Sequence, residues 1–288
     1  MHWIALCRPK QWVKNSFLLA PVLFSGKVLD LPELLKAVVA VGCFSLLSSS
    51  VYCLNDLLDA EADRLHPRKR NRPIASGAVS PAAAILLVII LTAGAFGLGW
   101  WFLPLPFLAW ALAYLANSTL YSLFLKHRVI VDVLSIAIGF VIRLGAGCAA
   151  VAVVPSPWLF VCGFSLAMML GFGKRRLELE VIKDPSAHRK NLESYNIEKV
   201  NMLLAVSSAV CLLAYMLYTI DPETVRIHET RYLIYSTPFV AYGLFRYVFK
   251  VQEGRHDGPL EVLTSDWVFT LNSVLWVVVV FLILYVLK

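Results

Sequence analysis

Long apolar runs alternate with short polar connections along most of the chain. A helix needs about 20 mostly apolar residues to cross the hydrocarbon core of a bilayer. Nine runs approach that length, so the pattern predicts an all-α, polytopic membrane protein with about nine transmembrane helices. The first run is the weakest because Pro21 and Gly26 interrupt it. The predicted spans cover residues 15–29, 33–54, 81–103, 106–125, 129–151, 157–173, 199–220, 232–250 and 267–287.

Composition supports this prediction. The chain is 59% hydrophobic and 16% charged, with a mean hydropathy of +0.72. A soluble domain is usually about half apolar and a quarter charged. No polar linker is long enough to separate two domains, so we expect a single integral membrane domain over residues 1–288. The net charge of +7 does not indicate nucleic acid, because the basic residues stand between apolar runs.

The basic residues are unevenly distributed between the connections. If the N-terminus is cytoplasmic and the nine spans alternate in direction, twenty of the 26 Lys and Arg residues lie on the cytoplasmic side and five on the other. The last, Arg143, lies within a span. An excess of Lys and Arg marks the cytoplasmic side of a membrane protein. We therefore expect a multi-pass protein of the inner (plasma) membrane whose active face is cytoplasmic.

An acidic motif ends the second predicted span. Helical spacing places Asn55, Asp59 and Asp63 on one stripe, four residues apart, with Asp56 beside it. Clustered carboxylates repel one another unless a cation joins them, and hard oxygen ligands suit Mg²⁺, which also shares the phosphates of a substrate. The four residues therefore form a predicted magnesium site. The alternative is a solvated helix end, although unpaired charges are costly at a membrane boundary.

A basic segment over residues 64–77 follows the acidic motif directly. Arg64, Lys69 and Arg72 lie in it, and a basic loop beside an acidic cluster can hold a phosphorylated ligand between cations and metal. Arginine favours bidentate phosphate contacts, whereas lysine acts as a point charge. The alternative is that these residues only enforce topology or contact anionic lipid. The two roles are compatible.

The fifth predicted span carries ionisable residues. Asp132 and Arg143 are eleven residues apart, close to three helical turns, so they share a face about 16 Å apart. An arginine within a membrane is expensive and should face an interior cavity with a partner. Arg143 is therefore a candidate functional residue, or else a member of a structural interhelical pair. Tyr121 and Lys126, just before this span, are further candidates.

A second charged motif ends the sixth predicted span. Lys174 and Glu178 are one turn apart on one face, with Arg175 between them, and Arg189 and Tyr195 follow in the next connection. This motif occupies the position in the second half of the chain that the acidic motif occupies in the first. The alternative is an ordinary charged cap on a membrane span.

Together these motifs resemble the UbiA-type polyprenyl transferase superfamily. The pattern Asn55-Asp56-x-x-Asp59-x-x-x-Asp63 is similar to the first Asp-rich motif of that superfamily, and nine helices with cytoplasmic active loops are similar to its architecture. Within it, the chain most resembles the decaprenyl-phosphate phosphoribosyltransferase branch. The resembling stretches are residues 8–15, 55–77, 121–126, 132–147, 173–178 and 257–266.

The resemblance implies a reaction. The donor would be phosphoribosyl pyrophosphate, the acceptor a polyprenyl phosphate lipid and the cofactor Mg²⁺. Asp56, Asp59 and Asp63 would act with the metal on the departing pyrophosphate, and Lys126, Arg143 and Lys174 would position phosphate groups. The residues predicted to bind substrate are Lys14, Asn55, Arg64, Lys69, Arg72, Tyr121, Asp132, Arg175, Glu178, Arg189 and Tyr195.

Other functions stay open at this point. The same fold could transfer a prenyl group from a prenyl diphosphate to an aromatic acceptor such as 4-hydroxybenzoate. Many superfamily members carry a second Asp-rich motif after the sixth span, and Lys174-x-x-x-Glu178 in its place weakens that alternative. A transporter is disfavoured because the acidic motif lies at the membrane boundary and not at the midplane. A phosphatidyl-type alcohol transferase would need a denser Asp-Gly arrangement than this chain has.

Overall fold

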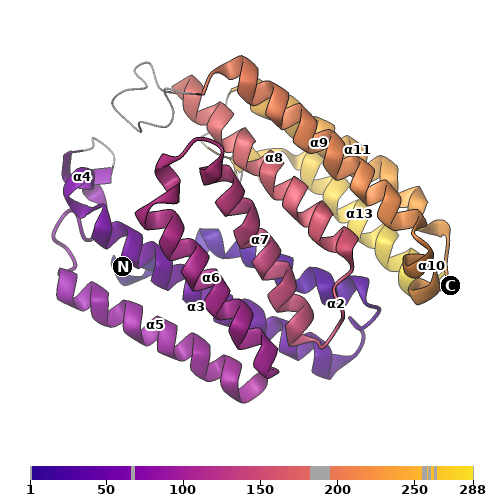
Figure 1. The fold of residues 1–288 in the computed structure, drawn as a ribbon, viewed down its shortest axis with the longest axis horizontal. Coiled ribbons are helices and arrows are strands. Elements are labelled where there is room, and N and C mark those ends of the chain that lie inside the picture. Colours follow the sequence, from indigo (N-terminus) through magenta and orange to yellow (C-terminus); the bar gives the residue numbers. More distant parts are fainter. Residues whose placement is uncertain are drawn as a thin grey trace. The chain divides into compact units, whose positions relative to one another are not determined.

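The computed structural model describes residues 2–65, 69–181, 195–254, 258, 261–262 and 265–287, and all regular structure in these segments is helical (Figure 1). The α-helices are α1 (His2–Cys7), α2 (Ala20–Phe24), α3 (Leu31–Leu58), α4 (Ala60–Leu65), α5 (Pro81–Phe102), α6 (Leu105–Leu123), α7 (Val131–Ala150), α8 (Pro157–Val181), α9 (Ile197–Ile220), α10 (Pro222–His228), α11 (Thr237–Gln252) and α13 (Trp267–Tyr285). Short 3₁₀ segments are η1 (Pro9–Leu19), η2 (Lys69–Asn71), η3 (Leu125–His127) and η6 (Tyr232–Ser236).

Six of the described helices are long and apolar enough to cross a bilayer: α3, α5, α7, α8, α9 and α13. Each forms where the sequence predicts a span, which confirms an all-α, polytopic membrane protein. The helices α6 and α11 also form within predicted runs, but α11 has only 16 residues. The total of nine transmembrane helices therefore stays a prediction.

The first predicted span, residues 15–29, is not one continuous helix. The chain here forms the 3₁₀ segment η1 and then the five-residue α2. Pro21, the second residue of α2, has no N–H to donate to a carbonyl of the preceding η1, and Gly26 adopts a left-handed backbone with φ of 76° soon after α2 ends. These two residues, which weaken the apolar pattern, also break the helix.

The chain divides into two compact units that interleave along the sequence. Unit 1 comprises Met1–Leu23, Lys27–Ser122 and Ile142–Val154, and unit 2 comprises Phe24–Gly26, Leu123–Val141 and Pro155–Lys288. The helix α7 contributes its first part to unit 2 and its last part to unit 1. A single transferase domain over the whole chain stays a prediction.

In unit 1, α3 packs against α5 and η1 (Figure 1). The core is built around Phe44, whose ring centroid lies 5.8 Å from that of Phe107 and 5.1 Å from that of Tyr114. Polar side chains attach η1 to α3: Asn15 Nδ2 donates to Ser45 Oγ at 3.1 Å. Such side-chain bonds hold a segment whose backbone lacks the regular hydrogen bonds of an α-helix.

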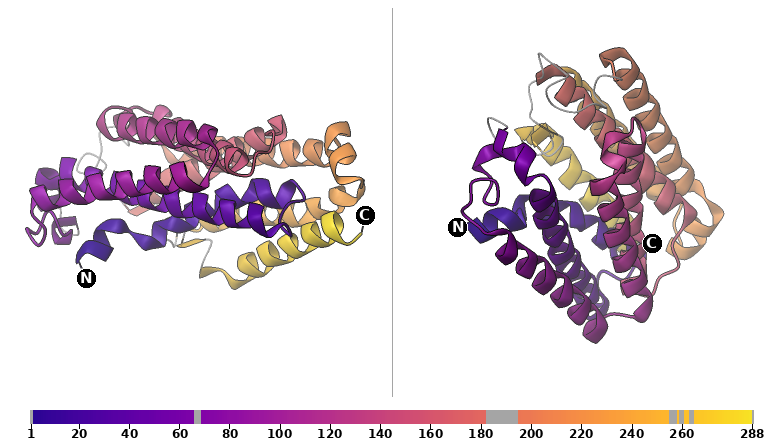
Figure 2. Two further views of the ribbon diagram at one scale, coloured as in Figure 1. Left: turned by 90° about the horizontal axis from the view of Figure 1, so that it is seen from below. Right: turned by 60° about the vertical axis from the view of Figure 1, so that its left-hand side comes forward.

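In unit 2, α8 packs against α9, and α11 packs against α8, α9 and α13 (Figure 1 and Figure 2). Small residues on α8 permit close approach. A Cβ at Gly171 would lie 2.6 Å from Val133 Cγ1, and a Cβ at Gly173 would lie 2.3 Å from the Tyr247 hydroxyl. Glycine at these two positions therefore sets the spacing of α8 from its neighbours.

We predict that Gly147→Ala destabilises the protein by about 1–3 kcal/mol, the usual cost of overpacking. A Cβ at Gly147 on α7 would lie 2.6 Å from the Leu18 carbonyl oxygen, which belongs to backbone and cannot rotate away. The thermal unfolding midpoint in detergent should fall. The control is Gly97→Ala on α5, where nothing lies within 4 Å of the added Cβ; an equal fall in both variants would contradict the packing explanation.

Candidate functional site

The acidic motif lies at the junction of α3 and α4 in unit 1. Asp59 interrupts the helix for a single residue, yet its N–H donates to the Asn55 carbonyl at 2.9 Å and its own carbonyl accepts from the Asp63 N–H at 2.8 Å. The helical course therefore continues nearly unbroken through the motif, as the sequence spacing predicts. Asp56 and Asp63 are buried, whereas Asn55 and Asp59 are half-buried.

Two arginines hold the buried acids. Arg72 Nη1 lies 3.1 Å from Asp56 Oδ1 and 2.6 Å from Asp63 Oδ2. Arg8 Nη2 lies 2.5 Å from the same Asp56 oxygen, and its guanidinium stands 5.0 Å from the centroid of the Tyr52 ring. Asp56 and Asp63, which share Arg72, are thus seven residues apart, or two helical turns. Asp59, the neighbour of Asp63 on the predicted stripe, is not part of this shared pair.

The basic segment after α4 is folded so that Arg72 faces the acids. Ile74 and Val79 are buried with Leu6 and anchor the segment. The Arg72 N–H donates to the Lys69 carbonyl at 2.9 Å, which fixes the turn that η2 begins. Arg64, predicted to bind phosphate, donates from Nε to the Ala75 carbonyl at 3.3 Å and so stabilises the same segment.

The residues of the acidic motif fit a divalent cation. Among the described residues no three His, Cys, Asp or Glu side chains are arranged as a ready metal site. Nevertheless, oxygens of Asp56 and Asp63 converge on one cationic nitrogen of Arg72. Asn55 and Asp59 supply further hard oxygen donors on the same helical course, and this donor chemistry suits Mg²⁺.

A basic cluster lies elsewhere in unit 1. Arg143 is buried, donates from Nε to Asn15 Oδ1 at 3.0 Å and from Nη2 to the Tyr114 hydroxyl at 3.1 Å. The sequence predicts a partner for Arg143 inside the protein. The structure supplies two neutral side chains, one from η1 and one from α6. Both sequence alternatives are compatible with this arrangement, since an interhelical hydrogen-bonded arginine keeps its positive charge.

Lys14 belongs to the same cluster. Burial, together with the charges of Arg143 and Arg8, lowers the pKa of Lys14 from 10.5 to about 8. Positive charges that lie close together in a partly buried region create a positive electrostatic potential, which attracts anions. The cluster therefore agrees with the prediction that Lys14 binds a phosphate-bearing substrate, without testing it.

In unit 2 four predicted site residues form a buried network. Arg175 Nε lies 2.8 Å from Asp132 Oδ2, and Arg175 also pairs with Glu178. The Tyr195 hydroxyl donates to Asp132 Oδ1 at 3.0 Å. The side chains of Asp132 and Arg175 are 0% and 1% exposed, so they contact other protein groups and not solvent. The network therefore connects the start of α7, the last turns of α8 and the residues just before α9.

The network also fixes a strained turn. Ile130 has φ of 67°, in the left-handed region that a β-branched residue rarely adopts. Its N–H donates to the Tyr195 hydroxyl oxygen at 2.7 Å. Burial raises the pKa of Tyr195, so the hydroxyl keeps the proton it donates to Asp132. Tyr195 thereby ties the start of α9 to the segment that carries Lys126 in η3.

The remaining predicted residues are placed as follows. Lys174 Nζ lies 3.7 Å from Glu178 Oε1, and the side chain of Lys174 is 44% exposed. Tyr121 is half-buried near the end of α6, and Lys69 begins η2. Arg189 lies outside the described residues.

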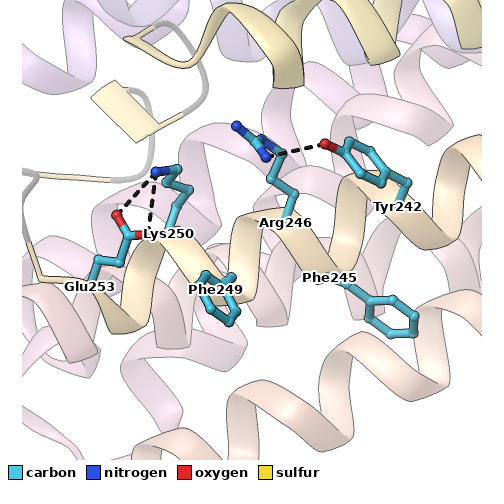
Figure 3. A pocket seen from close by; sticks show the side chains of 6 residues that line it. All are labelled: Tyr242, Phe245, Arg246, Phe249, Lys250 and Glu253. Atoms are coloured by element: carbon cyan, nitrogen blue, oxygen red, sulfur yellow. Dashed lines mark hydrogen bonds and ion pairs between the residues drawn. The ribbon is translucent and has the colours of Figure 1, made fainter.

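A pocket of about 330 Å³ runs along α11 in unit 2 and includes none of the predicted residues (Figure 3). Its two cations are matched by carboxylates: Arg246 makes bonds of 2.7 and 3.0 Å to Asp266, and Lys250 lies 3.0 Å from Glu253. The lining residues are Tyr242, Phe245, Arg246, Phe249, Lys250 and Glu253.

Arg8 is the residue that the sequence prediction of the site missed. It lies 48 positions before its partner Asp56, and only the tertiary structure shows the pair. The sequence offered one signal for Arg8, its place in the resembling stretch 8–15. The left-handed backbone of Arg8 could not be predicted from the sequence.

Comparison with known proteins agrees with the motifs. The sequence matches the UbiA prenyltransferase family over residues 16–274. It is 32% identical over 287 residues to the decaprenyl-phosphate phosphoribosyltransferase of Mycolicibacterium smegmatis, covering 95% of this chain and 89% of that protein. The protein of the same name from Mycobacterium tuberculosis is 32% identical over 279 residues, covering 95% and 91%. The fold is similar to that of a UbiA homolog from Archaeoglobus fulgidus bound to GPP and Mg²⁺, with a TM-score of 0.74, 21% identity and coverage of 99% and 100%.

We predict that Lys14→Met raises stability at pH 7, on the order of 2 kcal/mol, because it removes a buried charge repelled by Arg8 and Arg143. In the wild type the pKa of Lys14 is lower in the folded than in the unfolded chain. The unfolded chain therefore binds more protons between pH 8 and 10.5, and raising the pH through that window stabilises the folded state. Thermal unfolding against pH should show this rise in the wild type and a flatter profile in Lys14→Met. Lys10→Met, on the exposed side of η1, is the control.

We predict that Tyr195→Phe costs about 1–2 kcal/mol, because the Ile130 N–H and Asp132 each lose a partner. Amide hydrogen exchange at Ile130 should speed up, while the exchange of α5 in unit 1 stays unchanged. Tyr232→Phe serves as the matched control, since Tyr232 is 55% exposed. Unchanged exchange at Ile130 would show that the hydroxyl does not hold the turn.

Proposed function

The chain belongs to the UbiA prenyltransferase family and is a membrane transferase; from this premise we propose that it transfers 5-phosphoribosyl from phosphoribosyl pyrophosphate to a polyprenyl phosphate, releasing pyrophosphate. The observation that carries the proposal is the extent of the likeness. Two phosphoribosyltransferases named for decaprenyl phosphate align with 95% of this chain, so the likeness spans both halves and is not confined to the acidic motif. We propose that the acceptor is of the decaprenyl type.

The acidic motif suits the donor end of this reaction. Asp56, Asp59 and Asp63, with Asn55, would hold Mg²⁺, which when bound would supply positive charge to the departing pyrophosphate. The Mg²⁺-bound homolog from Archaeoglobus supports a divalent cofactor. The lipid phosphate is already an adequate nucleophile, so no general base is required. The task of the protein is to place charges where the negative charge develops.

Charge accounting supports the phosphoribosyl donor. Phosphoribosyl pyrophosphate and a lipid phosphate together bring a diphosphate, a 5-phosphate and an acceptor phosphate. A prenyl diphosphate with a neutral acceptor brings only one diphosphate. The larger negative load needs protein cations besides the metal. We propose that these are Lys14, Arg64, Lys69, Arg72, Lys126, Arg143, Lys174, Arg175 and Arg189, with Tyr121, Asp132, Glu178 and Tyr195 in supporting roles.

Prenyl transfer to an aromatic acceptor is the second candidate. The specific observation that favours it is the likeness to the Archaeoglobus homolog, whose structure contains GPP. That likeness rests on 21% identity, so it bears on the fold more than on the donor. The experiment that separates the candidates offers both donors to one purified preparation in detergent with Mg²⁺.

The deciding assay measures labelled lipid. With radiolabelled phosphoribosyl pyrophosphate and polyprenyl phosphate, we expect label to enter the organic phase. With a prenyl diphosphate and 4-hydroxybenzoate, we expect no prenylated product. The opposite pair of results would replace the proposed function by the second candidate.

We predict that Asp59→Asn abolishes turnover, by about a hundredfold or more, while the protein still folds and inserts. Asp59 is half-buried between α3 and α4, so the substitution removes charge and keeps shape. Activity and thermal unfolding are measured on the same sample. Asp30→Asn, at the N-cap of α3, where no side-chain cap bond is present, is the control. Near-normal turnover of Asp59→Asn with Mg²⁺ would refute the metal assignment.

We also propose that the active face is cytoplasmic in the inner membrane, and predict the topology accordingly. In a variant without the native cysteines, Ser76→Cys should react with an impermeant thiol reagent only after the membrane is opened. Glu229→Cys, in the connection predicted on the opposite side, should react in intact cells. Both positions are exposed. Labelling of Ser76→Cys from outside intact cells would overturn the topology.

A further inference from the structure

One carboxylate oxygen in unit 1 serves two arginines at once. Asp56 Oδ1 lies 2.5 Å from Arg8 Nη2 and 3.1 Å from Arg72 Nη1. The same Arg72 nitrogen lies 2.6 Å from Asp63 Oδ2. The arginines therefore compete with any metal for the very oxygens that the acidic motif would offer to it.

The acids are buried and the arginines are not. The side chains of Asp56 and Asp63 are 3% and 5% exposed, whereas those of Arg8 and Arg72 are 30% and 28% exposed. Buried carboxylates need a counter-charge at all times, because an unpaired buried charge costs several kcal/mol. The guanidinium groups supply that charge from the surface side, where they can turn without a change in the core.

The backbones behind the two arginines are fixed. The Arg72 carbonyl accepts from the Ser76 N–H at 2.9 Å, and Arg8 follows Cys7, whose carbonyl accepts from Ser49 Oγ at 2.9 Å. Rotation of the side chains alone would therefore be enough to move the two guanidinium groups. Guanidinium groups bind phosphate oxygens as readily as carboxylates, so a diphosphate is a suitable alternative partner.

We propose that Arg8 and Arg72 are exchangeable counter-ions: they neutralise Asp56 and Asp63 while metal is away, and turn to the diphosphate when metal takes the carboxylates. This inference rests on the proposed function and adds to it a coupling between the binding of metal and the binding of diphosphate. Metal alone must displace two guanidinium groups into water, and diphosphate alone must draw them away from buried acids. Each ligand removes the cost that the other meets, so the two bind cooperatively. Linkage requires the coupling to be equal in both directions.

The test measures binding and not turnover. Mn²⁺ replaces Mg²⁺, and its binding to the full-length protein in detergent is titrated by electron paramagnetic resonance without pyrophosphate. In a second titration, the affinity for inorganic pyrophosphate is measured calorimetrically at saturating Mn²⁺. The variants are Arg72→Gln and Arg8→Gln. Arg70→Gln is the matched control, because it removes a positive charge from the same basic segment at an exposed residue of η2 that is not assigned to the site.

Opposite changes for the two ligands are the expected result. Arg72→Gln should bind Mn²⁺ alone about tenfold more tightly than wild type, within the usual range of coupling energies, and bind pyrophosphate about tenfold more weakly. Arg8→Gln should show the same two signs with smaller size, because Asp56 keeps Arg72. Arg70→Gln should change the affinity for Mn²⁺ alone by less than either.

Two results would overturn the inference. One is weaker binding of both ligands in Arg72→Gln and Arg8→Gln, which would mean that the arginines only maintain the structure. The other is an Mn²⁺ affinity of both variants no higher than that of Arg70→Gln, which would leave only the general effect of a lost charge. If the folded wild type binds neither Mn²⁺ nor its pyrophosphate complex, the metal site of the proposed function fails, and this inference falls with it.

Discussion

The burial of negative charge at the end of α3 is the constraint on which the rest of unit 1 depends. Asp56 and Asp63 lie at the end of a helix long and apolar enough to cross a bilayer, and just beyond it, and both side chains are almost inaccessible to water. Such charges persist only with a partner. The basic segment after α4 must therefore fold back, and the N-terminal segment must bring Arg8 to the same place. Leu6 and Ile74 are buried in one hydrophobic cluster and anchor these two segments, which keeps Arg8 and Arg72 beside the acids.

The segment η1 contributes a polar side chain to two partners in unit 1. Asn15 donates to Ser45 on α3 and accepts from the guanidinium of Arg143 on α7. Lys14 precedes it in the sequence and shares the basic cluster. Polar chemistry in this unit is thus built on a segment that gives up helical regularity.

Unit 2 handles charge differently. Its acids and bases are paired among themselves, and Asp132 and Arg175 are sealed from solvent. Tyr195 bonds to Asp132 in this network and also accepts from the Ile130 N–H. It thereby holds Ile130 in a left-handed conformation that a β-branched residue rarely adopts. Lys174 pairs with Glu178 at 3.7 Å, and its side chain is 44% exposed, so a ligand could reach it more easily than the sealed pair.

The sequence by itself determined the fold class, the family and the positions of the charged motifs. Apolar runs report solvation by lipid, and the spacing of Asn55, Asp59 and Asp63 reports one helical course, because both depend on residues close in the chain. It could not determine partners. That Arg72 bridges Asp56 and Asp63, that Arg8 reaches Asp56 across 48 residues, and that Asp132 pairs with Arg175 were decided by the tertiary structure. Ion pairs between distant segments follow from how helices pack and loops return, and no local pattern encodes that.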